Sequence, residues 1–214
     1  MTFWKLTAAL ILLAQSVTLG ELVATVDGRY NSMRSWQADF TQTYTAGLTT
    51  RTESGHLYLE KPGRMRWNYD QPEVKQFIVN GNRVWQYTAG ETEATETDLK
   101  SATDLRTPLR YLLGHTDLAR ELSGLSYSGM EPWHRGDSVI HGTPPPGEAG
   151  TWREVWIEVT PAYEIDRLVI AAEDGSRNDI KLSNIRPNTS LPGSLFQFVP
   201  PPGVKVIPGN GAGQ

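Results

Sequence analysis

Apolar and polar side chains alternate along a series of short segments, and turn-forming residue pairs separate those segments. In residues 36–44, Trp36, Ala38 and Phe40 alternate with polar residues, the period-2 pattern of a strand with one buried face. Pro62-Gly63, Gln71-Pro72 and Asn80-Gly81 end successive segments, and an Asn-Gly pair is typical of a tight hairpin. The pattern predicts strands over residues 36–44, 55–61, 64–70, 74–80, 82–87, 94–99, 125–130, 138–141, 152–160, 165–172, 179–185 and 196–199.

Helical spacing is confined to a few short stretches. Residues 21–33 carry apolar side chains on one side of a predicted helix, residues 105–113 form a second with Pro108 in its first turn, and 118–122 add another turn. A single sheet of this size must curl or close. We therefore predict a mainly β fold: a curved antiparallel sheet of about 10–11 strands in meander order, an unclosed or half β-barrel, with short α-helices as a lid over a hydrophobic cavity.

The first residues have the pattern of a secretory signal peptide. Lys5 precedes an apolar and small-residue run over 6–14, and the small residues Ala14 and Ser16 lie three and one before a cleavage position. The apolar run is too short for a membrane span. We predict a signal peptide over 1–20 with cleavage near 16–20, a single domain over 21–207 and a disordered tail over 208–214.

The composition excludes several classes of function. A formal net charge of −4 argues against nucleic-acid binding, which needs a basic surface. The absence of cysteine excludes disulfides, a thiol nucleophile, cysteine-ligated metal and a lipid-modified cysteine. The four histidines lie far apart with no i, i+4 pair, and no serine-nucleophile or nucleotide-binding motif occurs, so we predict no enzyme, no metal and no cofactor.

Large aromatic residues concentrate in two neighbouring predicted strands. Alternation places Met65, Trp67 and Tyr69 on one face of the first, and Trp85 and Tyr87 on one face of the second. We expect all five on a single surface. That surface is either an ordinary core or the wall of a cavity, and the few short helices, unable to cover a curled sheet completely, favour a cavity.

Several ordered motifs resemble the periplasmic outer-membrane lipoprotein carrier family, the LolA type. The matching stretches run in order from about residue 22 to 207, and they are Trp36–Gln42, Gly55–Trp67 with Tyr69 and Gln71-Pro72, Val79–Tyr87, Thr107–Leu113 and Phe196–Val204. The resemblance implies a monomer whose cavity takes the acyl chains of lipoproteins. It further implies that the chain receives lipoproteins from an inner-membrane ABC transporter complex and delivers them to an outer-membrane receptor. That receptor is itself a lipoprotein, so the lack of cysteine favours the carrier.

The resemblance also suggests roles for particular residues. It adds Leu109, Leu112 and Leu113 of the lid helix to the cavity lining. Lys61, which precedes Pro62 where relatives commonly carry arginine, corresponds to the latch that donates to lid-helix carbonyls. An ammonium lacks the planar fork of a guanidinium, so this latch is expected to open more readily.

Three other functions stay open from the sequence. One is a lipid-sensing envelope-stress protein of the same fold. Another is a carbohydrate-binding module that uses Trp67, Trp85 and Tyr69 as stacking platforms. The third is a hydrolase whose carboxylates no motif identifies.

Overall fold

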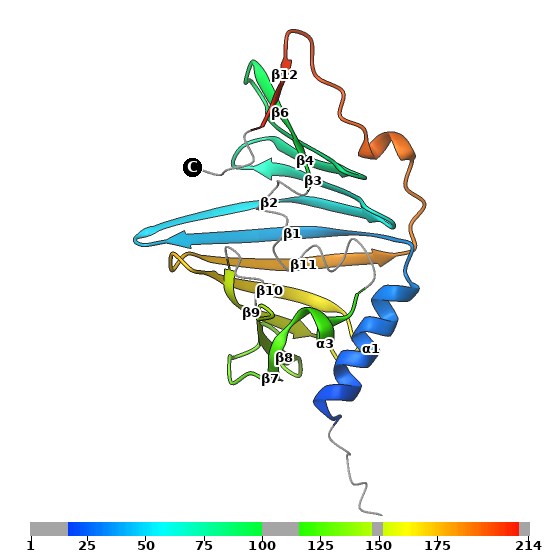
Figure 1. Ribbon diagram of the computed structural model, residues 1–214, viewed down its shortest axis with the longest axis vertical. Coiled ribbons are helices and arrows are strands. Elements are labelled where there is room, and N and C mark those ends of the chain that lie inside the picture. Colours follow the sequence, from blue (N-terminus) through cyan, green and yellow to red (C-terminus); the bar gives the residue numbers. More distant parts are fainter. Residues whose placement is uncertain (1–16, 100–115, 147–151, 210–214) are drawn as a thin grey trace, which may run out of the picture.

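The computed structural model describes residues 17–99, 116–146 and 152–209. Within these ranges, 12 strands form one sheet whose two end strands do not pair with each other (Figure 1). The strands are β1 (Ser35–Ala46), β2 (Thr49–Glu60), β3 (Arg64–Gln71), β4 (Lys75–Asn80), β5 (Arg83–Thr88), β6 (Glu93–Asp98), β7 (Ser123–Tyr127), β8 (Ser138–Thr143), β9 (Trp152–Val159), β10 (Ile165–Ala172), β11 (Arg177–Pro187) and β12 (Lys205–Pro208). The predicted fold class, a mainly β unclosed curved sheet with short helices, is confirmed.

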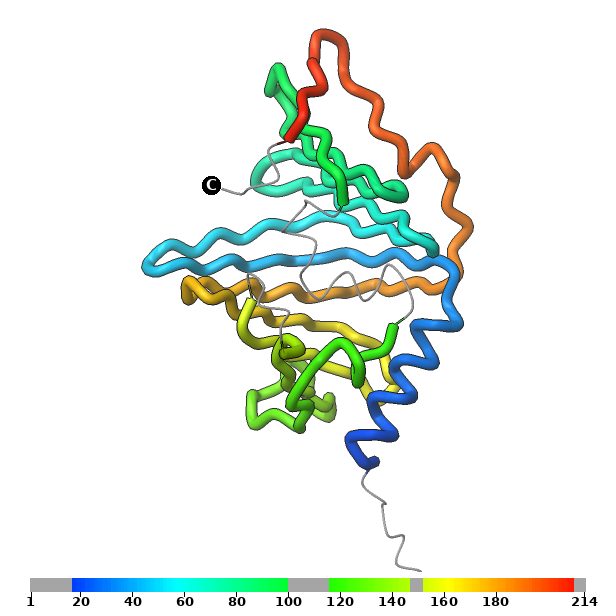
Figure 2. Tube along the Cα trace, viewed as in Figure 1, coloured from blue at the N-terminus to red at the C-terminus, as the bar shows by residue number. Residues whose placement is uncertain are grey.

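The sheet consists of two meanders that meet in its middle. Its order is β12-β6-β5-β4-β3-β2-β1-β11-β10-β9-β8-β7, so β1 lies beside β11 although some 140 residues separate them in the chain. Figure 2 shows this join as a blue strand beside an orange one. The simple meander predicted from the sequence therefore holds within each half, and long-range pairing joins the halves.

One face of the sheet, called the inner face here, carries the hydrophobic core. Alternate residues of the strands supply it, because neighbouring side chains along a strand point to opposite faces. The buried inner-face side chains include Trp36, Phe40, Leu57, Leu59, Met65, Trp67, Val79, Val84, Ile140, Val155, Ile157, Leu168, Ile180 and Leu182. The opposite face is called the outer face.

Helix α1 (Leu19–Ser32) packs its apolar side against this core. Thr18 and Glu21 form a reciprocal capping box that fixes its start, and Leu22, Val23 and Val26 are buried against the sheet. A second short helix, α3 (Leu118–Glu121), contacts α1 beside β7 and buries Leu118 (Figure 1). The predicted helices over 21–33 and 118–122 are thus present, while the predicted helix over 105–113 lies outside the described residues.

The C-terminal segment crosses the outer face of the first meander instead of forming the predicted strand over 196–199. It contains a 3-10 turn, η2 (Gly193–Phe196), whose Phe196 is fully buried, and it contacts β3 and β4. The alternation around Phe196 and Phe198 reflects burial against a sheet, without strand pairing of its own. Farther on, β12 pairs in parallel with β6, which corrects the prediction of a wholly antiparallel sheet.

The described part of the chain ends just after β12. Strand β12 extends to Pro208, the Gly209 amide donates to the Glu96 carbonyl over 2.8 Å, and residues 210–214 lie outside the described part. Among the described residues, no helix is both long and apolar enough to cross a membrane.

Candidate functional site

An aromatic cluster occupies the inner face where β1 and β3 approach each other across β2. The ring of Phe40 lies edge-on to Trp67, with centroids 4.5 Å apart, and to Tyr69 at 4.9 Å. Trp67 and Tyr69 stack at 6.2 Å, and the Trp67 indole N–H donates to the sulfur of Met65 over 2.8 Å. Met65, Trp67 and Tyr69 therefore share one apolar surface, as the alternation predicts.

The close packing of these rings depends on a residue without a side chain. Gly55 pairs with Phe40 on one side and Tyr69 on the other, beside a register shift between Ser54 and Gly55. A Cβ atom at Gly55 would overlap the backbone carbonyl oxygen of Asn68. The strand tolerates only glycine here, and the rings of the two residues paired with it, Phe40 and Tyr69, contact each other.

Polar groups border the cluster at one end of the inner face. The Glu53 carboxylate is buried, with a side chain 3% exposed, and it accepts from Lys75 Nζ at 2.5 Å. The same ammonium lies 4.3 Å from the centre of the Tyr69 ring, and the Tyr69 hydroxyl donates to Gln42 over 3.3 Å. The apolar surface thus ends at a charged and hydrogen-bonded border.

Trp85 and Tyr87 lie on the outer face, so the prediction that they share a surface with Trp67 is wrong. Trp85 pairs with Ile78, and Tyr87 pairs with Gln76. Both partners are outer-face residues of β4, because the inner-face residue Trp67 pairs with Phe77 between them. Odd-numbered residues therefore face inward on β3 and β4, and the two-residue β4–β5 turn brings even-numbered residues to the inner face of β5.

The C-terminal segment packs against Tyr87 from outside. Phe198 lies 6.0 Å from the ring of Tyr87, and the Trp85 indole N–H donates to Glu96 over 3.0 Å. Arg66 fixes the segment by donating to the carbonyl of Leu195 over 2.8 Å. Tyr87 and Arg66 therefore help to hold the end of the chain against the sheet, whereas Trp85 is bonded to its neighbour strand β6.

Lys61 does bond to a helix carbonyl, and the helix is α1. Its ammonium donates over 2.8 Å to the carbonyl oxygen of Tyr30, in the last turn of α1, and burial lowers the pKa of Lys61. Tyr30 also connects α1 to the sheet. Its buried hydroxyl accepts a hydrogen bond from the amide of Ile165 over 2.9 Å, and its ring contacts Trp36 edge-on. Burial raises the pKa of the Tyr30 hydroxyl. Lys61 thus links the end of β2 to the helix that spans toward β10.

The three predicted lid residues, Leu109, Leu112 and Leu113, lie outside the described residues. The described chain on either side of them is fixed by hydrogen bonds. Leu99 donates its amide to Asn82 over 2.8 Å, and Asn31 of α1 exchanges hydrogen bonds of 2.7 and 2.8 Å with the backbone of Thr116. The described chain therefore stops beside β5 and β6 on one side of these residues and resumes on α1 at the other.

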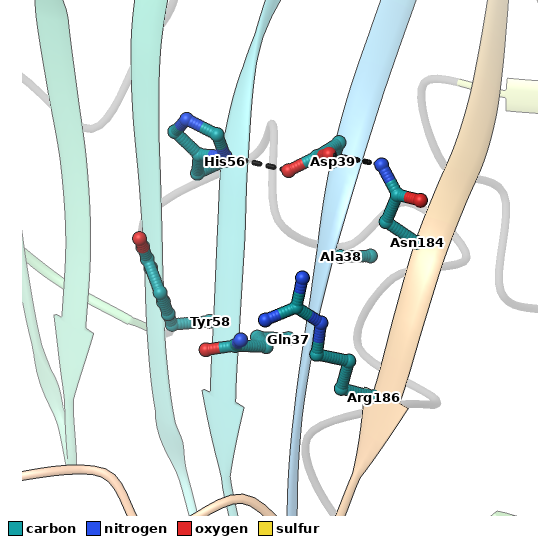
Figure 3. A pocket seen from close by; sticks show the side chains of 7 residues that line it. All are labelled: Gln37, Ala38, Asp39, His56, Tyr58, Asn184 and Arg186. Atoms are coloured by element: carbon teal, nitrogen blue, oxygen red, sulfur yellow. Dashed lines mark hydrogen bonds and ion pairs between the residues drawn. The ribbon is translucent and has the colours of Figure 1, made fainter.

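A polar hollow of about 280 Å³ lies on the outer face across β11, β1 and β2 (Figure 3). Asp39 stands at its centre, accepting from Asn184 over 2.6 Å and lying 2.7 Å from the imidazole of His56. The hydrogen bond from Asn184, and then the one with His56, lower the pKa of Asp39. Its lining is polar and suits no acyl chain.

A group of titratable side chains that the sequence did not identify gathers elsewhere on the outer face. His134, Asp137, Glu158 and Asp166 come from a loop and two strands, and their ligand atoms lie within 4.8 Å of one another. Burial, followed by the neighbouring Asp166 carboxylate, raises the pKa of Asp137. No spacing rule could have found the group, because its members meet only after β9 and β10 pair.

Solved structures share this architecture. An uncharacterized conserved protein from Thermus thermophilus superposes with a TM-score of 0.56 at 15% identity, covering 87% of this chain and 97% of that one. A DUF1329 family protein from Desulfovibrio piger gives a TM-score of 0.50, again at 15% identity, over 83% of this chain and 95% of the other. The chain therefore shares its fold with these two solved proteins.

Sequence comparison identifies the family. Residues 31–199 match the family described as "Outer membrane lipoprotein carrier protein LolA", and the chain belongs to it. An outer-membrane lipoprotein carrier protein from Methylococcus capsulatus is 31% identical over 182 residues, 83% of each chain. One from Nitrosospira multiformis is 27% identical over 200 residues, 92% of this chain and 93% of that one. The predicted resemblance is confirmed, and the family is one of carriers, not of enzymes.

Proposed function

We propose that this chain is a periplasmic carrier that binds the acyl chains of outer-membrane lipoproteins on the inner face of its sheet. The observation that carries the proposal is the aromatic cluster of Phe40, Trp67 and Tyr69 on a continuous apolar face of a family member. Aromatic rings and the adjacent Met65 provide broad apolar contact that adapts to flexible chains.

Within this proposal, Met65, Trp67 and Tyr69 line the binding surface, and Leu109, Leu112 and Leu113 complete it from the segment between β6 and Thr116. The polar border formed by Glu53, Lys75 and Gln42 supports one orientation of the bound lipoprotein. Acyl chains enter the apolar region, and the polar part of the lipoprotein stays at the border. Trp85 and Tyr87 are excluded from the lining because they face outward.

Because acyl chains bind so favourably, contacts within the protein must compete with the cargo for the inner face. Burial of acyl chains gains about 0.8 kcal/mol per CH₂, so complete burial of a triacyl group would make release very slow. Described inner-face residues already bury one another and α1. Cargo must displace part of that packing, and the free energy recovered when the empty carrier closes favours release to a receptor.

Lys61 takes a modified latch role in this proposal. The latch was expected on a lid helix, whereas the bond to Tyr30 holds α1 against the end of β2. Movement of α1 away from the inner face would break this bond. We therefore assign Lys61 to stabilisation of the closed, cargo-free state.

Membership of the family supports a proposal for the partners and the location. Lipoproteins reach the carrier from an inner-membrane ABC transporter complex and leave it for an outer-membrane lipoprotein receptor, and the carrier works as a monomer in the periplasm. Export requires removal of the leader. Cleavage after Ser16 would preserve the capping box of Thr18 and Glu21, together with the 2.9 Å hydrogen bond from Tyr127 to the Val17 carbonyl. We therefore propose Val17 as the first residue of the mature chain.

One of the alternative functions, the carbohydrate-binding module, loses support, and a second, the lipid sensor, is left to experiment. Trp67 is 3% exposed and Trp85 lies on the other face, so they cannot form one stacking platform for a sugar. A lipid-sensing protein of the same fold would use the same inner face. Transfer of bound cargo to a receptor distinguishes a carrier from a sensor.

A matched pair of tyrosines tests the proposal. Tyr69 and Tyr87 are both half-buried, on strands of the same meander but on opposite faces. We expect Tyr69→Glu to weaken binding of a triacylated lipopeptide at least tenfold, because it places a charge on the acyl-chain surface. Tyr87→Glu serves as the control for the cost of the same substitution on the outer face, and circular dichroism checks that both variants fold.

Binding is measured by titrating the purified mature protein with the lipopeptide, and transfer by adding receptor to the loaded carrier. Equal binding by wild type and folded Tyr69→Glu would overturn the assignment of the inner face. Loss of binding in Tyr87→Glu alone would move the site to the outer face. Tight binding without transfer would favour the sensor.

A further inference from the structure

The four-residue group on the outer face, His134, Asp137, Glu158 and Asp166, lies away from the surface proposed for lipids. Glu158 pairs with Val139 and Arg167. Its neighbour Ile157 belongs to the inner-face core, so the Glu158 side chain points outward. Asp166 sits at a register shift of β10, and His134 and Asp137 come from the loop between β7 and β8.

Two carboxylates in this group are buried with incomplete hydrogen bonding. The side chains of Asp137 and Asp166 are 4% and 7% exposed. Oδ2 of Asp137 and Oδ1 of Asp166 have no hydrogen-bond partner among the residues that the structure describes. A buried anionic oxygen without a donor is costly, so each of these two oxygens requires an explanation.

The cations nearby are already engaged. Arg167 makes its short contacts to Asp179, at 2.7 and 3.0 Å, and reaches Glu158 only at 3.5 Å. Glu158 also accepts from the backbone amide of His134 over 3.0 Å. Lys181 lies over the ring of Trp133, 4.9 Å from its centre. Three carboxylates therefore face one another, and the positive groups found beside them in the described part of the chain are the His134 imidazole and a guanidinium shared with Asp179.

We infer that His134, Asp137, Glu158 and Asp166 form a binding site for one divalent transition-metal ion, with Zn²⁺ as the best-suited ion. An imidazole nitrogen combined with carboxylate oxygens is a ligand set typical of zinc, and an all-oxygen set would instead favour calcium or magnesium. The ion would supply the positive charge that the unpartnered oxygens of Asp137 and Asp166 lack.

The geometry requires only small side-chain movement. Ligand atoms around a tetrahedral zinc ion, bonded at about 2.0–2.2 Å, lie roughly 3.4 Å apart, whereas these lie within 4.8 Å. His134 is the mobile partner, because its side chain is 53% exposed. Its Nδ1 now lies 2.9 Å from Asp166 Oδ2 and would exchange that hydrogen bond for the metal.

Metal binding would fasten the loop before β8 to the outer face of β9 and β10. The loop supplies two of the ligands and the strands supply the other two, so the ion joins three separate stretches of chain. The consequence is stabilisation of the second meander, without contact with the inner face.

The experiment uses the mature protein freed of metal by a chelator, then titrated with Zn²⁺ alone by calorimetry. We expect one Zn²⁺ per chain by elemental analysis after gel filtration. At a free Zn²⁺ concentration 100 times Kd, the Tm should rise by roughly 5–10 °C. His134→Ala and Asp137→Asn should each bind at least about 10–100-fold more weakly, since even partners that only support a ligand contribute that much.

His56→Ala is the matched control. His56 is also on the outer face, 2.7 Å from Asp39 and 3.4 Å from Asp70, but both of these carboxylates are exposed. This variant should bind Zn²⁺ like the wild type. Absence of stoichiometric binding, or equal binding by wild type and His134→Ala, would overturn the inference. Loss of binding only in His56→Ala would do the same.

The variant Asp137→Asn distinguishes a bound metal ion from a proton shared between Asp137 and Asp166. It removes repulsion between the carboxylates, so the metal-free variant should melt at or above the wild-type temperature while its response to Zn²⁺ disappears. If that variant is stabilised and the wild type binds no Zn²⁺ at pH 6 or pH 8, the two aspartates share a proton and the inference fails.

Discussion

Replacing Lys61 with methionine removes the donor to α1 and keeps an apolar stem of similar length. In the wild type, the ammonium donates to the Tyr30 carbonyl over 2.8 Å. This carbonyl also accepts from the amide of Met33 over 3.3 Å, so it keeps one partner in the variant. The substitution therefore removes one bond without leaving a buried acceptor unpaired.

The expected magnitude follows from that arrangement. A hydrogen bond to a charged group contributes about 1.5–3 kcal/mol, and partial exposure of the Lys61 side chain reduces this value. A cation at the C-terminal end of a helix adds about 0.3–1 kcal/mol. We expect Lys61→Met to lower the free energy of unfolding by about 1–2 kcal/mol, which corresponds to a Tm lower by about 2–8 °C.

Urea unfolding of the mature protein measures the loss, and an unchanged m value would show that the denatured state is unaffected. Hydrogen exchange should speed up selectively in the last turn of α1. Lys61→Arg retains a donor and should recover most of the stability. In receptor-dependent transfer, Lys61→Met should deliver cargo more slowly, because the emptied carrier no longer regains this bond on closing.

Two results would refute this reasoning. Equal stability of the wild type, Lys61→Met and Lys61→Arg would mean that the bond contributes nothing to the closed state. A loss in Lys61→Arg as large as that in Lys61→Met would indicate that packing around the stem, and not the donor, matters.

Further predictions concern the sheet and its anchors. Gly55→Ala should cost about 2–3 kcal/mol in urea unfolding, since the new methyl overlaps a backbone carbonyl of β3; an unperturbed midpoint would contradict this. Tyr30→Phe should cost about 1–3 kcal/mol by leaving a buried amide of β10 without its acceptor, and a near-neutral effect would show that water replaces the hydroxyl. Asp39→Asn tests pH dependence: the folded pKa of Asp39 is lowered, so its stabilising contribution is present above the unfolded value near 3.9 and is lost as pH falls through the folded pKa. The difference between wild-type and variant midpoints should therefore shrink between pH 7 and pH 3, and a constant difference would count against it.

Local patterns were sufficient to predict most strands and the sheet class. Strands such as β3 and β10 follow from alternation or apolar runs between turn residues, and α1 follows from helical spacing. These signals depend on the nearest few residues, and tertiary structure did not override them. The prediction of a strand around Phe196 was wrong. Phe196 and Phe198 pack against the outer face of the sheet, and this burial produces the same alternation as a strand.

The candidate site was only partly predictable. The alternation within β3 correctly grouped Met65, Trp67 and Tyr69. To place Trp85 on the correct face, one must know how the strands pair across two successive turns. The two-residue turn between β4 and β5 changes the inward-facing residues from odd-numbered to even-numbered ones. The partner of Lys61 and the meeting of His134 with Asp166 depend on pairings between distant segments, which no local pattern contains.

The two edges of the sheet bear on how an open sheet avoids polymerising. An unclosed sheet presents unpaired backbone groups at each edge, which can recruit a second copy. At one edge, β12 is only four residues long and ends in Pro208, which has no amide hydrogen to donate. At the other, Gly124 takes a left-handed conformation and the pairing of β7 with β8 is irregular between Ser123 and Ser126. Each border is thus too short or too distorted to template another sheet, so the barrel can remain open for exchange of cargo without the molecules stacking edge to edge.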